Sequence, residues 1–447
     1  MKIVHSRTKK TIYNALTSIS GYVITVILGF VGRMIFLKYL AVELLGINGL
    51  FTSILQIFSL AELGFATAVT YALYKPLSQN DEMKIAVLMR YYAKIYMIIG
   101  LIVLSSGLLL LPFLEYLING FDEVNITLNE LRLYYVIFLA STGSTYFIAY
   151  KRTLIISDQK KYIANFVNIY VSIINRIIQI LIVVFTKNFA LYLTIQVISV
   201  YAENIIISFI VSSKYKYLKN YKNEKISEDE KKALFMNIKA LFIAKVSSVF
   251  TSGIMSIIIS KMIGLKEVGL YSNYLLLTSS ITTVLLLIFE SATASVGNYV
   301  VTENKNDQRV LFKNILFFNS FFAVIFYVGL TVLFNEFIEI WLGKDMLLDN
   351  WVPVFMSLNM FIWIMRNTSW IFYNAYGLYK YFYYRSFFEV AIFIGLVFPG
   401  AIFFGISGII IAQIISVLLT QLPFEIFVVS KYAIMQKPRY YLYFLQG

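Results

Sequence analysis

Apolar runs of about 20 residues recur along the whole chain, and this feature restricts the fold more than any other. Such a run crosses a bilayer as a helix, because lipid offers no partners to backbone N–H and C=O groups. The composition agrees, with 59% hydrophobic and 14% charged residues, against about 45–50% and about 25% in soluble domains. We therefore predict an all-α polytopic membrane protein with twelve transmembrane helices. Their ranges are 13–37, 46–74, 87–114, 133–156, 163–186, 189–212, 238–262, 268–300, 314–335, 352–376, 386–404 and 407–429.

The basic residues are distributed unevenly between the two sides of these spans. Of the 38 Lys and Arg residues, 27 fall in the two termini and the loops on their side, and six fall on the opposite side. Cytoplasmic loops carry such an excess, so both termini are expected in the cytoplasm. The net charge of +14 then reflects topology and attraction to anionic lipid, and nucleic acid is not expected as a partner. Because the first span follows the basic head Lys2–Lys10 directly, no separate signal peptide is expected.

Residues that carry enzyme or metal chemistry are scarce in this sequence. The absence of cysteine excludes disulfides, thiol catalysis and cysteine-ligated metal. The single histidine, His5, lies in the basic head, and the sequence has no phosphate-binding loop motif. We therefore expect no enzyme activity, no cofactor and no metal site.

The longest inner loop divides the chain into two halves. This loop, 213–237, is rich in lysine and lies between the first six spans and the last six. A weak repeat with an offset of 223 residues aligns Lys38 with Lys261 and Gly46 with Gly269. An even number of spans in each half predicts a parallel repeat about an axis along the membrane normal, with the substrate path between the halves. We predict an N-terminal lobe at 1–212, a linker at 213–237, a C-terminal lobe at 238–430 and a cytoplasmic tail at 431–447.

Charged residues within the spans are the candidates for function, because a charge in hydrocarbon is costly unless it faces a polar interior. Most lie roughly 10–20 Å from the cytoplasmic span ends at about 1.5 Å per residue, which suggests a water-filled cavity. We predict that the basic members bind phosphate or pyrophosphate and that the acidic members bind a coupling ion. Structural ion pairs are the alternative. The basic candidates are Arg33 (nearer the outer side), Lys94, Arg176, Lys245 and Arg366, and the acidic candidates are Glu62, Glu203 and Glu290.

Two further glutamates and several aromatic residues are interpreted differently. Glu389 and Glu425 lie near cytoplasmic span ends, so we expect them at the membrane interface. Trp363 and Trp370 lie along the tenth span on either side of Arg366. Aromatic faces stack against sugar rings, but helix packing and the aromatic belt at the interface explain these residues more simply.

The stretch from Gly32 to Asp81 resembles a known family. It contains, in order, Gly32-Arg33, Lys38-Tyr39-Leu40, Leu44-Leu45-Gly46, Ser59-Leu60-Ala61-Glu62-Leu63-Gly64 and Tyr74-Lys75-Pro76-Leu77. This order is similar to the N-terminal pattern of bacterial polysaccharide repeat-unit flippases (Wzx-type). These are polysaccharide transporters of the multidrug/oligosaccharidyl-lipid/polysaccharide (MOP) exporter superfamily, and the resemblance extends to the span count of the whole chain.

The resemblance implies two six-helix lobes in a MATE-like V shape. It also implies a flippase of the bacterial inner membrane that moves an undecaprenyl-pyrophosphate-linked oligosaccharide from the inner to the outer leaflet, for capsule or O-antigen assembly. The implied partners are this lipid-linked oligosaccharide, membrane lipid, a proton or sodium ion, and other membrane proteins of polysaccharide assembly. Lipid II flippases of the same superfamily have additional spans, whereas we predict twelve here.

Other functions remain as alternatives. A cation-coupled multidrug exporter of the same superfamily would be expected to have an acidic cavity, whereas the charges counted within these spans are mainly basic. A membrane-embedded polysaccharide polymerase or glycosyltransferase predicts a large outer loop with catalytic residues, and the outer loops here are short. A lipid scaffold that transports nothing predicts no layer of buried charge.

Overall fold

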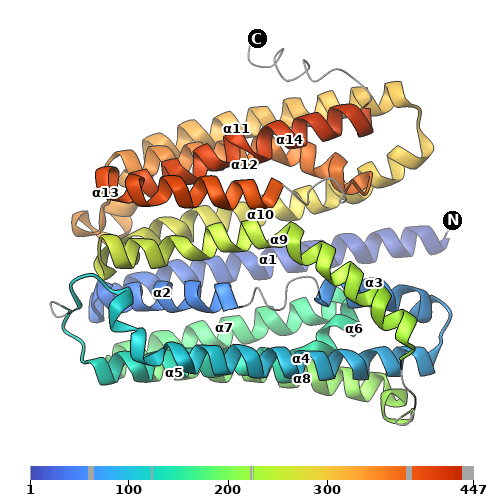
Figure 1. Ribbon diagram of the computed structural model, residues 1–447, viewed down its shortest axis with the longest axis horizontal. Helices are drawn as coiled ribbons and strands as arrows, with labels where there is room; N and C mark the ends of the chain where they lie inside the picture. The colour runs from blue at the N-terminus through green and yellow to red at the C-terminus, as the bar shows by residue number, and fades with distance from the viewer. Residues whose placement is uncertain are drawn as a thin grey trace. The chain divides into compact units, whose positions relative to one another are not determined.

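The computed structural model describes residues 2–58, 65–121, 124–221, 224, 226–378 and 385–434 (Figure 1). The side chains of 1–20, 239–248 and scattered further helical positions are outside this description. All regular elements of the described residues are helices, which confirms the prediction of an all-α fold. By length and composition, six of the described helical stretches are able to cross a membrane. These are Gly21–Tyr39, Glu82–Phe113, Lys161–Thr186, Phe189–Lys214, Lys305–Leu342 and Arg385–Ile434.

The chain divides into two units, and each is described by itself. Unit 1 comprises Met1–Leu44 and Phe51–Phe242, and unit 2 comprises Leu45–Leu50 and Ile243–Gly447. The loop 213–237 and the first turns of the following helix therefore belong to unit 1.

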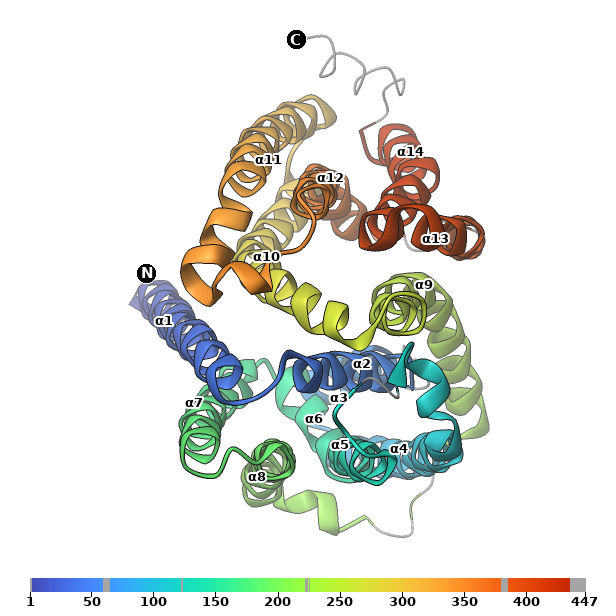
Figure 2. The same cartoon turned by 90° about the vertical axis from the view of Figure 1, so that its left-hand side faces the viewer.

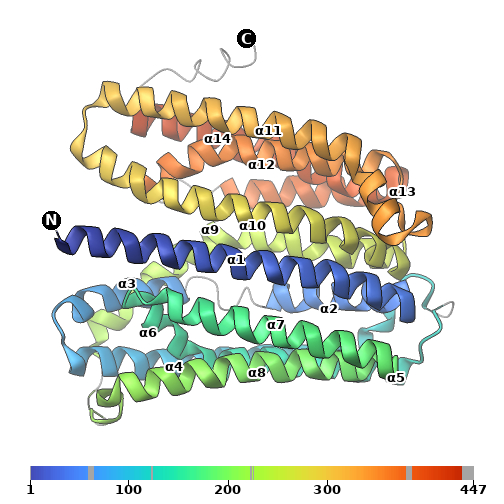
Figure 3. The same ribbon diagram turned by 180° about the vertical axis from the view of Figure 1, so that it is seen from behind.

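Unit 1 is a bundle of helices around a tyrosine-rich core. Helix α1 packs on α7, α5 packs on both α4 and α8, and α3 packs on α4 and α6 (Figure 3). Tyr92, Tyr96 and Tyr146 are at most 2% exposed in this core. The helices are α1 (Lys2–Tyr39), α2 (Val42–Phe58), α3 (Phe65–Ser78), α4 (Glu82–Leu110), α5 (Leu128–Ile148), α6 (Arg152–Ser157), α7 (Lys161–Thr186) and α8 (Phe189–Lys214).

Unit 2 is arranged around helix α12, which packs on four neighbouring helices. These neighbours are α10, α11, α13 and α14, and the view along the helices shows α12 among them (Figure 2). A short π-helical segment, Val429–Ile434, follows the last helix. The helices are α9 (Glu228–Met262), α10 (Leu265–Thr302), α11 (Lys305–Leu342), α12 (Trp351–Ala375), α13 (Arg385–Leu419) and α14 (Gln421–Val428).

The helix bounds of the two halves follow the repeat offset seen in the sequence. Helices begin at three pairs of positions whose numbers differ by 223, namely Val42 and Leu265, Glu82 and Lys305, and Leu128 and Trp351. The caps agree as well. The side chain of Asp81 accepts a hydrogen bond from the Lys84 amide at 2.9 Å, and that of Asn304 accepts one from the Asp307 amide at 3.1 Å. Each cap satisfies an N–H group that the first helical turn leaves unpaired.

The described parts of the span predicted at 46–74 are α2 and α3, and residues 59–64 are outside the described residues. One other predicted span is interrupted. The span predicted at 133–156 contains the end of α5, a 3-10 turn at Ala149–Lys151 and the short helix α6. The charged residues Lys151 and Arg152 lie where this turn leads into α6.

A glycine hairpin separates the last two predicted spans. Gly405 has φ 57° and ψ −136°, a conformation that favours glycine, inside the stretch assigned to α13. A Cβ atom placed on Gly408 would lie 1.9 Å from the carbonyl oxygen of Gly400. Eight residues of continuous helix would separate these positions by about 12 Å, so the chain reverses at Gly405. This reversal confirms the predicted boundary between spans 386–404 and 407–429.

The loop 213–237 is attached to unit 1 at several points. The Arg90 guanidinium donates to the carbonyl oxygens of Tyr221 and Glu224, the latter at 3.2 Å, and Lys84 forms an ion pair with Glu230. Ile226 and Leu234 are 7% and 6% exposed and pack into the apolar core of unit 1. The described part of this loop is therefore a docked segment rather than a free tether.

Replacing Arg90 by alanine is expected to make this loop several-fold more sensitive to trypsin, because two backbone carbonyl groups lose their donor. Trypsin cleavage at the loop lysines, followed by mass spectrometry, measures the effect. Lys313→Ala is the control, since Lys313 occupies the position 223 residues after Arg90 in unit 2. Equal cleavage rates for wild type and Arg90→Ala would contradict the docking role.

The ionisation of Glu230 decides at which pH the loop contact exists during trypsin cleavage. The hydrogen bond from Lys84 lowers the pKa of the Glu230 carboxyl group. A lowered acid pKa stabilises the folded state above the unfolded value of about 4.3. That contribution is lost only as pH falls through the lowered value. The Lys84–Glu230 contact is therefore intact at the neutral and mildly alkaline pH at which trypsin works.

Candidate functional site

The structure describes the side chains of five of the eight candidate residues. These are Arg33, Lys94, Arg176, Glu203 and Arg366. Glu62 is outside the described residues, and the side chains of Lys245 and Glu290 are outside the described side chains. The predicted roles of these three residues stay predictions.

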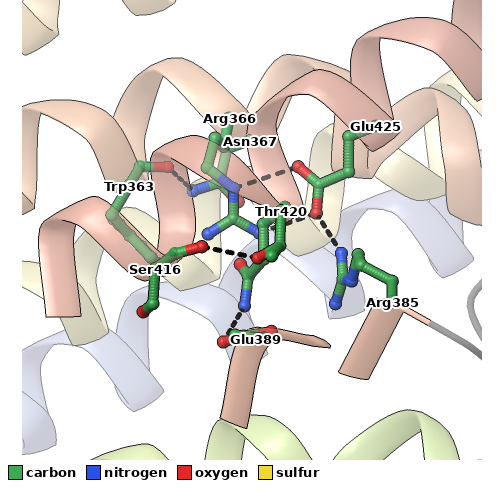
Figure 4. Close-up of polar contacts among 9 residues, drawn as sticks. Trp363, Arg366, Asn367, Arg385, Glu389, Ser416, Thr420 and Glu425 are labelled. Carbon is green, nitrogen blue, oxygen red and sulfur yellow. Dashed lines mark hydrogen bonds and ion pairs between the residues drawn. The ribbon is translucent and has the colours of Figure 1, made fainter. Parts of the chain in front are cut away.

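An ion cluster in unit 2 joins three helices. The Arg366 guanidinium on α12 donates two hydrogen bonds to the Glu425 carboxylate on α14, at 3.0 and 2.6 Å. Arg385, at the start of α13, donates to the same carboxylate at 2.9 Å. Figure 4 shows both arginine side chains pointing toward Glu425. The side chains are 16%, 0% and 7% exposed for Arg366, Glu425 and Arg385, so the cluster is buried and the bidentate contact is of the strong, charge-assisted type.

A second buried carboxylate lies next to this cluster. Glu389 is 1% exposed, and one of its oxygens accepts a hydrogen bond from the Gln421 side chain (Figure 4). Its Oε2 atom has no hydrogen-bond partner among the described residues. Carboxylates rarely remain buried without partners, so Glu389 is a candidate for a functional role that the sequence analysis did not assign.

Glu389 and Glu425 are buried inside unit 2, at 1% and 0% exposed, and their expected depth at the membrane interface stays a prediction. The hairpin at Gly405 returns the chain so that α14 lies beside the start of α13, and this brings Glu425 within reach of Arg385. The sequence contained one signal for this arrangement. Arg385 and Glu389, and likewise Gln421 and Glu425, are four residues apart, so each pair lies on one helix face.

The cluster forms part of the wall of a cavity within unit 2. The cavity has a volume of about 650 Å³ and lies among α9, α10, α12, α13 and α14. Apart from Ile362, the α12 wall consists of one helix face with three-and-four spacing. Its members are Met356, Asn359, Met360, Trp363, Arg366, Asn367 and Trp370. The other walls add hydroxyl, amide and charged groups, from Thr251, Thr278, Thr282, Arg385, Glu389, Gln413 and Gln421.

Unit 1 contains an ion cluster of related design. Arg152 donates to one oxygen of Glu203 at 2.7 Å, and the Asn168 amide donates to the other oxygen at 3.1 Å. Each carboxylate oxygen of Glu203 thus has a side-chain partner among the described residues. The side chains of Arg152 and Glu203 are 33% and 15% exposed, so this cluster is more open to its surroundings than the one in unit 2.

The two clusters connect equivalent spans of the two halves. In each, an arginine of the fourth predicted span binds a glutamate of the sixth: Arg152 with Glu203, and Arg366 with Glu425. The next helix adds a second donor: Asn168 on α7 in unit 1, within the fifth predicted span, and Arg385 at the start of α13 in unit 2, one residue before the eleventh predicted span. The offset between the paired residues varies, which is why the linear repeat does not reveal this correspondence.

The basic residues of unit 1 separate into two groups. Arg33 on α1 interacts electrostatically with Arg176 and Tyr192, on α7 and α8. Helices α1 and α7 pack closely there, since a Cβ on Gly32 would lie 3.7 Å from Ile180. Lys94 is exposed on α4 and forms no ion pair with any described residue. The structure therefore brings Arg33 and Arg176 together and does not place Lys94 with them.

Acidic and histidine side chains do not gather into a metal site in the described part of the chain. No group of three or more such residues there is placed to hold a metal ion. This finding is limited to the described residues, and Glu62 and Glu290 were not part of it.

Comparison with known proteins identifies a family and a shared fold. A family model described as "Polysaccharide biosynthesis protein" matches residues 11–294. No curated protein matches the chain. The chain is similar to an inward-facing multidrug resistance MATE family transporter of the MOP superfamily, with a TM-score of 0.67 and 11% identity over 94% of this chain and 99% of that one.

Two other solved structures are similar in the same way. A MATE transporter from Vibrio cholerae has a TM-score of 0.66 and 15% identity, covering 98% of this chain and 100% of that one. The lipid II flippase MurJ, in an inward closed conformation, has a TM-score of 0.67 and 16% identity, covering 93% of this chain and 87% of that one. Identities this low show the fold alone, and they confirm the prediction of an all-α, multi-pass membrane protein of MATE-like fold.

Proposed function

The chain belongs to the polysaccharide biosynthesis protein family, and we propose that it is a flippase for a lipid-linked oligosaccharide. The proposed substrate is an oligosaccharide on undecaprenyl pyrophosphate, moved from the cytoplasmic to the outer leaflet of the bacterial inner membrane for capsule or O-antigen assembly. Both chain termini would lie in the cytoplasm, as the distribution of basic residues predicts. The lipid tail would stay in the bilayer while the head group passes through the protein by alternating access.

The observation that carries this proposal is the polar cavity inside unit 2. A sugar-bearing, charged head group cannot cross hydrocarbon without a polar path, because each unsatisfied polar group costs several kcal/mol there. The cavity of about 650 Å³ offers amides, hydroxyls and charges inside a unit built from apolar helices. Passage of a head group through such a cavity requires no chemical change of the substrate, which fits a transporter rather than an enzyme.

We propose that the pyrophosphate interacts with the arginines of unit 1. Arg33 interacts electrostatically with Arg176, and two guanidinium groups in one region favour an anion that shares them. Lys94 and Lys245 remain further candidates for this role. Arg366 is less suited to it, since its guanidinium already binds the Glu425 carboxylate.

We also propose that transport is coupled to a proton or sodium ion. Glu389 is buried and has one oxygen without a hydrogen-bond partner among the described residues, so it joins Glu62, Glu203 and Glu290 as a coupling candidate.

Reconstitution tests the proposed function. Lipid-linked oligosaccharide and purified protein are placed in liposomes, and membrane-impermeant periodate oxidises the sugars exposed on the outside. Without protein only the outer leaflet reacts, and with active protein nearly all of the lipid is expected to react. Absence of protein-dependent oxidation would overturn the proposal, and export of a cationic dye by the same liposomes would instead favour a multidrug exporter.

Arg176→Ala is expected to slow flipping about tenfold, as expected for the loss of a charge-assisted hydrogen bond to the substrate. The measurement is the initial oxidation rate, compared at equal amounts of folded protein. Arg132→Ala, at the start of α5, is the matched control and should flip at the wild-type rate. A parallel fall in flipping and in the yield of folded protein for Arg176→Ala would favour a structural role.

A further inference from the structure

We propose that the cavity of unit 2 is a saccharide-binding subsite that holds the sugar part of the substrate and excludes its pyrophosphate. This inference rests on the proposed flippase function and adds a division of labour within it. The residues around the cavity include arginines and glutamates whose charges cancel, two tryptophan indole groups and a pair of side-chain amides. Each of these three features points to an uncharged, hydroxyl-rich ligand.

The charges around the cavity cancel within the protein. Arg366 and Arg385 both bind Glu425, and Glu389 lies beside them (Figure 4). Among the described side chains that line the cavity or belong to this cluster, two arginines and two glutamates leave no formal net charge. A pyrophosphate entering here would have to displace Glu425 from Arg366 and leave a carboxylate buried without its partners, which is strongly unfavourable. The cluster therefore positions the cavity wall and does not attract an anion.

Two tryptophans offer flat apolar surfaces on the cavity side of α12. Trp363 and Trp370 are seven residues apart and both line the cavity. Trp370 lies parallel to the buried Tyr373, with ring centroids 5.5 Å apart and planes at 14°, and it remains 42% exposed. Trp363 is braced by Phe289 at 5.9 Å. Rings held in this way present a fixed face, and the C–H face of a sugar ring packs against such a surface.

Paired amides supply the polar part of the site. The Asn359 amide donates to Gln413 at 3.2 Å, and both residues line the cavity. Each amide group carries two donor hydrogens and two acceptor lone pairs, so the pair retains both kinds of group for neighbouring hydroxyls after its mutual bond. A volume of about 650 Å³ falls within the roughly 300–1,000 Å³ of small-molecule sites, which combine apolar walls with a few placed polar groups.

Saturation-transfer NMR on the full-length protein in nanodiscs tests this subsite. The probes are the free oligosaccharide released by mild acid from the source cells' lipid-linked pool, and inorganic pyrophosphate. The oligosaccharide is expected to bind wild type, and Trp370→Ala and Asn359→Ala should weaken that binding about tenfold or more, the range of central contacts in binding sites. Trp370→Phe retains a ring and should bind better than Trp370→Ala. Trp351→Ala, at the other end of α12, should bind as wild type does.

Several results would overturn the inference. The first is absence of oligosaccharide binding to wild type. The second is binding by Trp370→Ala and Asn359→Ala that equals wild-type binding. The third is competitive displacement of the oligosaccharide by pyrophosphate. Size-exclusion profiles and Trp370→Phe separate loss of the subsite from loss of folding. The liposome assay separates the two proposals. Wild type that flips lipid while the cavity variants bind the oligosaccharide unchanged would reject the subsite alone, and wild type that binds the oligosaccharide without flipping would reject the flippase alone.

Discussion

Gly408→Ala is expected to prevent the last two spans from packing and to remove most of the folded protein. The added Cβ would lie 1.9 Å from the carbonyl oxygen and 2.4 Å from the carbonyl carbon of Gly400. Both atoms belong to the backbone, so no side chain can move aside. The cost should exceed the ~1–3 kcal/mol of ordinary overpacking, because the helices must separate along the contact that small residues permit.

The measurement is the unfolding temperature in detergent, together with the yield of monodisperse protein. Gly395→Ala is the matched control, since it lies on the same helix and a Cβ there meets nothing within 4 Å. Alanine at that open helical position is expected to stabilise the protein by about 0.5–1 kcal/mol. A Gly408→Ala protein as stable as wild type would show that the hairpin does not pack as described.

Glu425→Ala is expected to be the most damaging substitution among the charged residues. It leaves the buried guanidinium groups of Arg366 and Arg385 without the carboxylate that both contact. Removing one partner from a buried pair typically costs about 3–5 kcal/mol. Glu203→Ala is the matched comparison in unit 1, where Arg152 is 33% exposed. That pair is less deeply buried, so the loss should be closer to the ~1 kcal/mol of exposed pairs.

Unfolding of both variants by heat measures this difference. Equal losses would contradict the assignment of the unit 2 cluster as the more deeply buried of the two. The triple variant Arg366→Met/Arg385→Met/Glu425→Met then tests whether the two arginines have a role beyond their ion pairs, because apolar replacements of a buried ion cluster are often tolerated. If stability returns but flipping does not, the arginines contribute to transport. If both return, the cluster is structural.

The sequence was sufficient to predict the fold class and the repeat. Apolar runs and the near absence of charge within them require helices, because the backbone must satisfy its own hydrogen bonds in lipid. The 223-residue offset was visible in scattered matches such as Lys38 and Lys261. Helix starts at Glu82 and Lys305 show the same offset in three dimensions, since caps and turns are local features that the chain encodes locally.

The sequence was less informative about which charges meet. Arg366 was predicted to bind substrate, yet it forms two hydrogen bonds to Glu425, a residue expected at the interface. Partners 59 positions apart in sequence come together only when the Gly405 hairpin places α14 beside α12 and α13. Periodicity identifies the face on which a charge lies, but it carries no information about the opposing helix.

The apolar pattern of this chain thus determines a helical membrane protein, because each segment satisfies its own backbone hydrogen bonds within one helix. The repeat of that pattern determines two similar halves. The packing of those segments decides which charges meet and where a cavity forms. It pairs Arg152 with Glu203 and Arg366 with Glu425, and it encloses a polar cavity among five helices. Each of these contacts joins residues tens of positions apart. Their energies depend on burial and distance, which exist only in the folded protein.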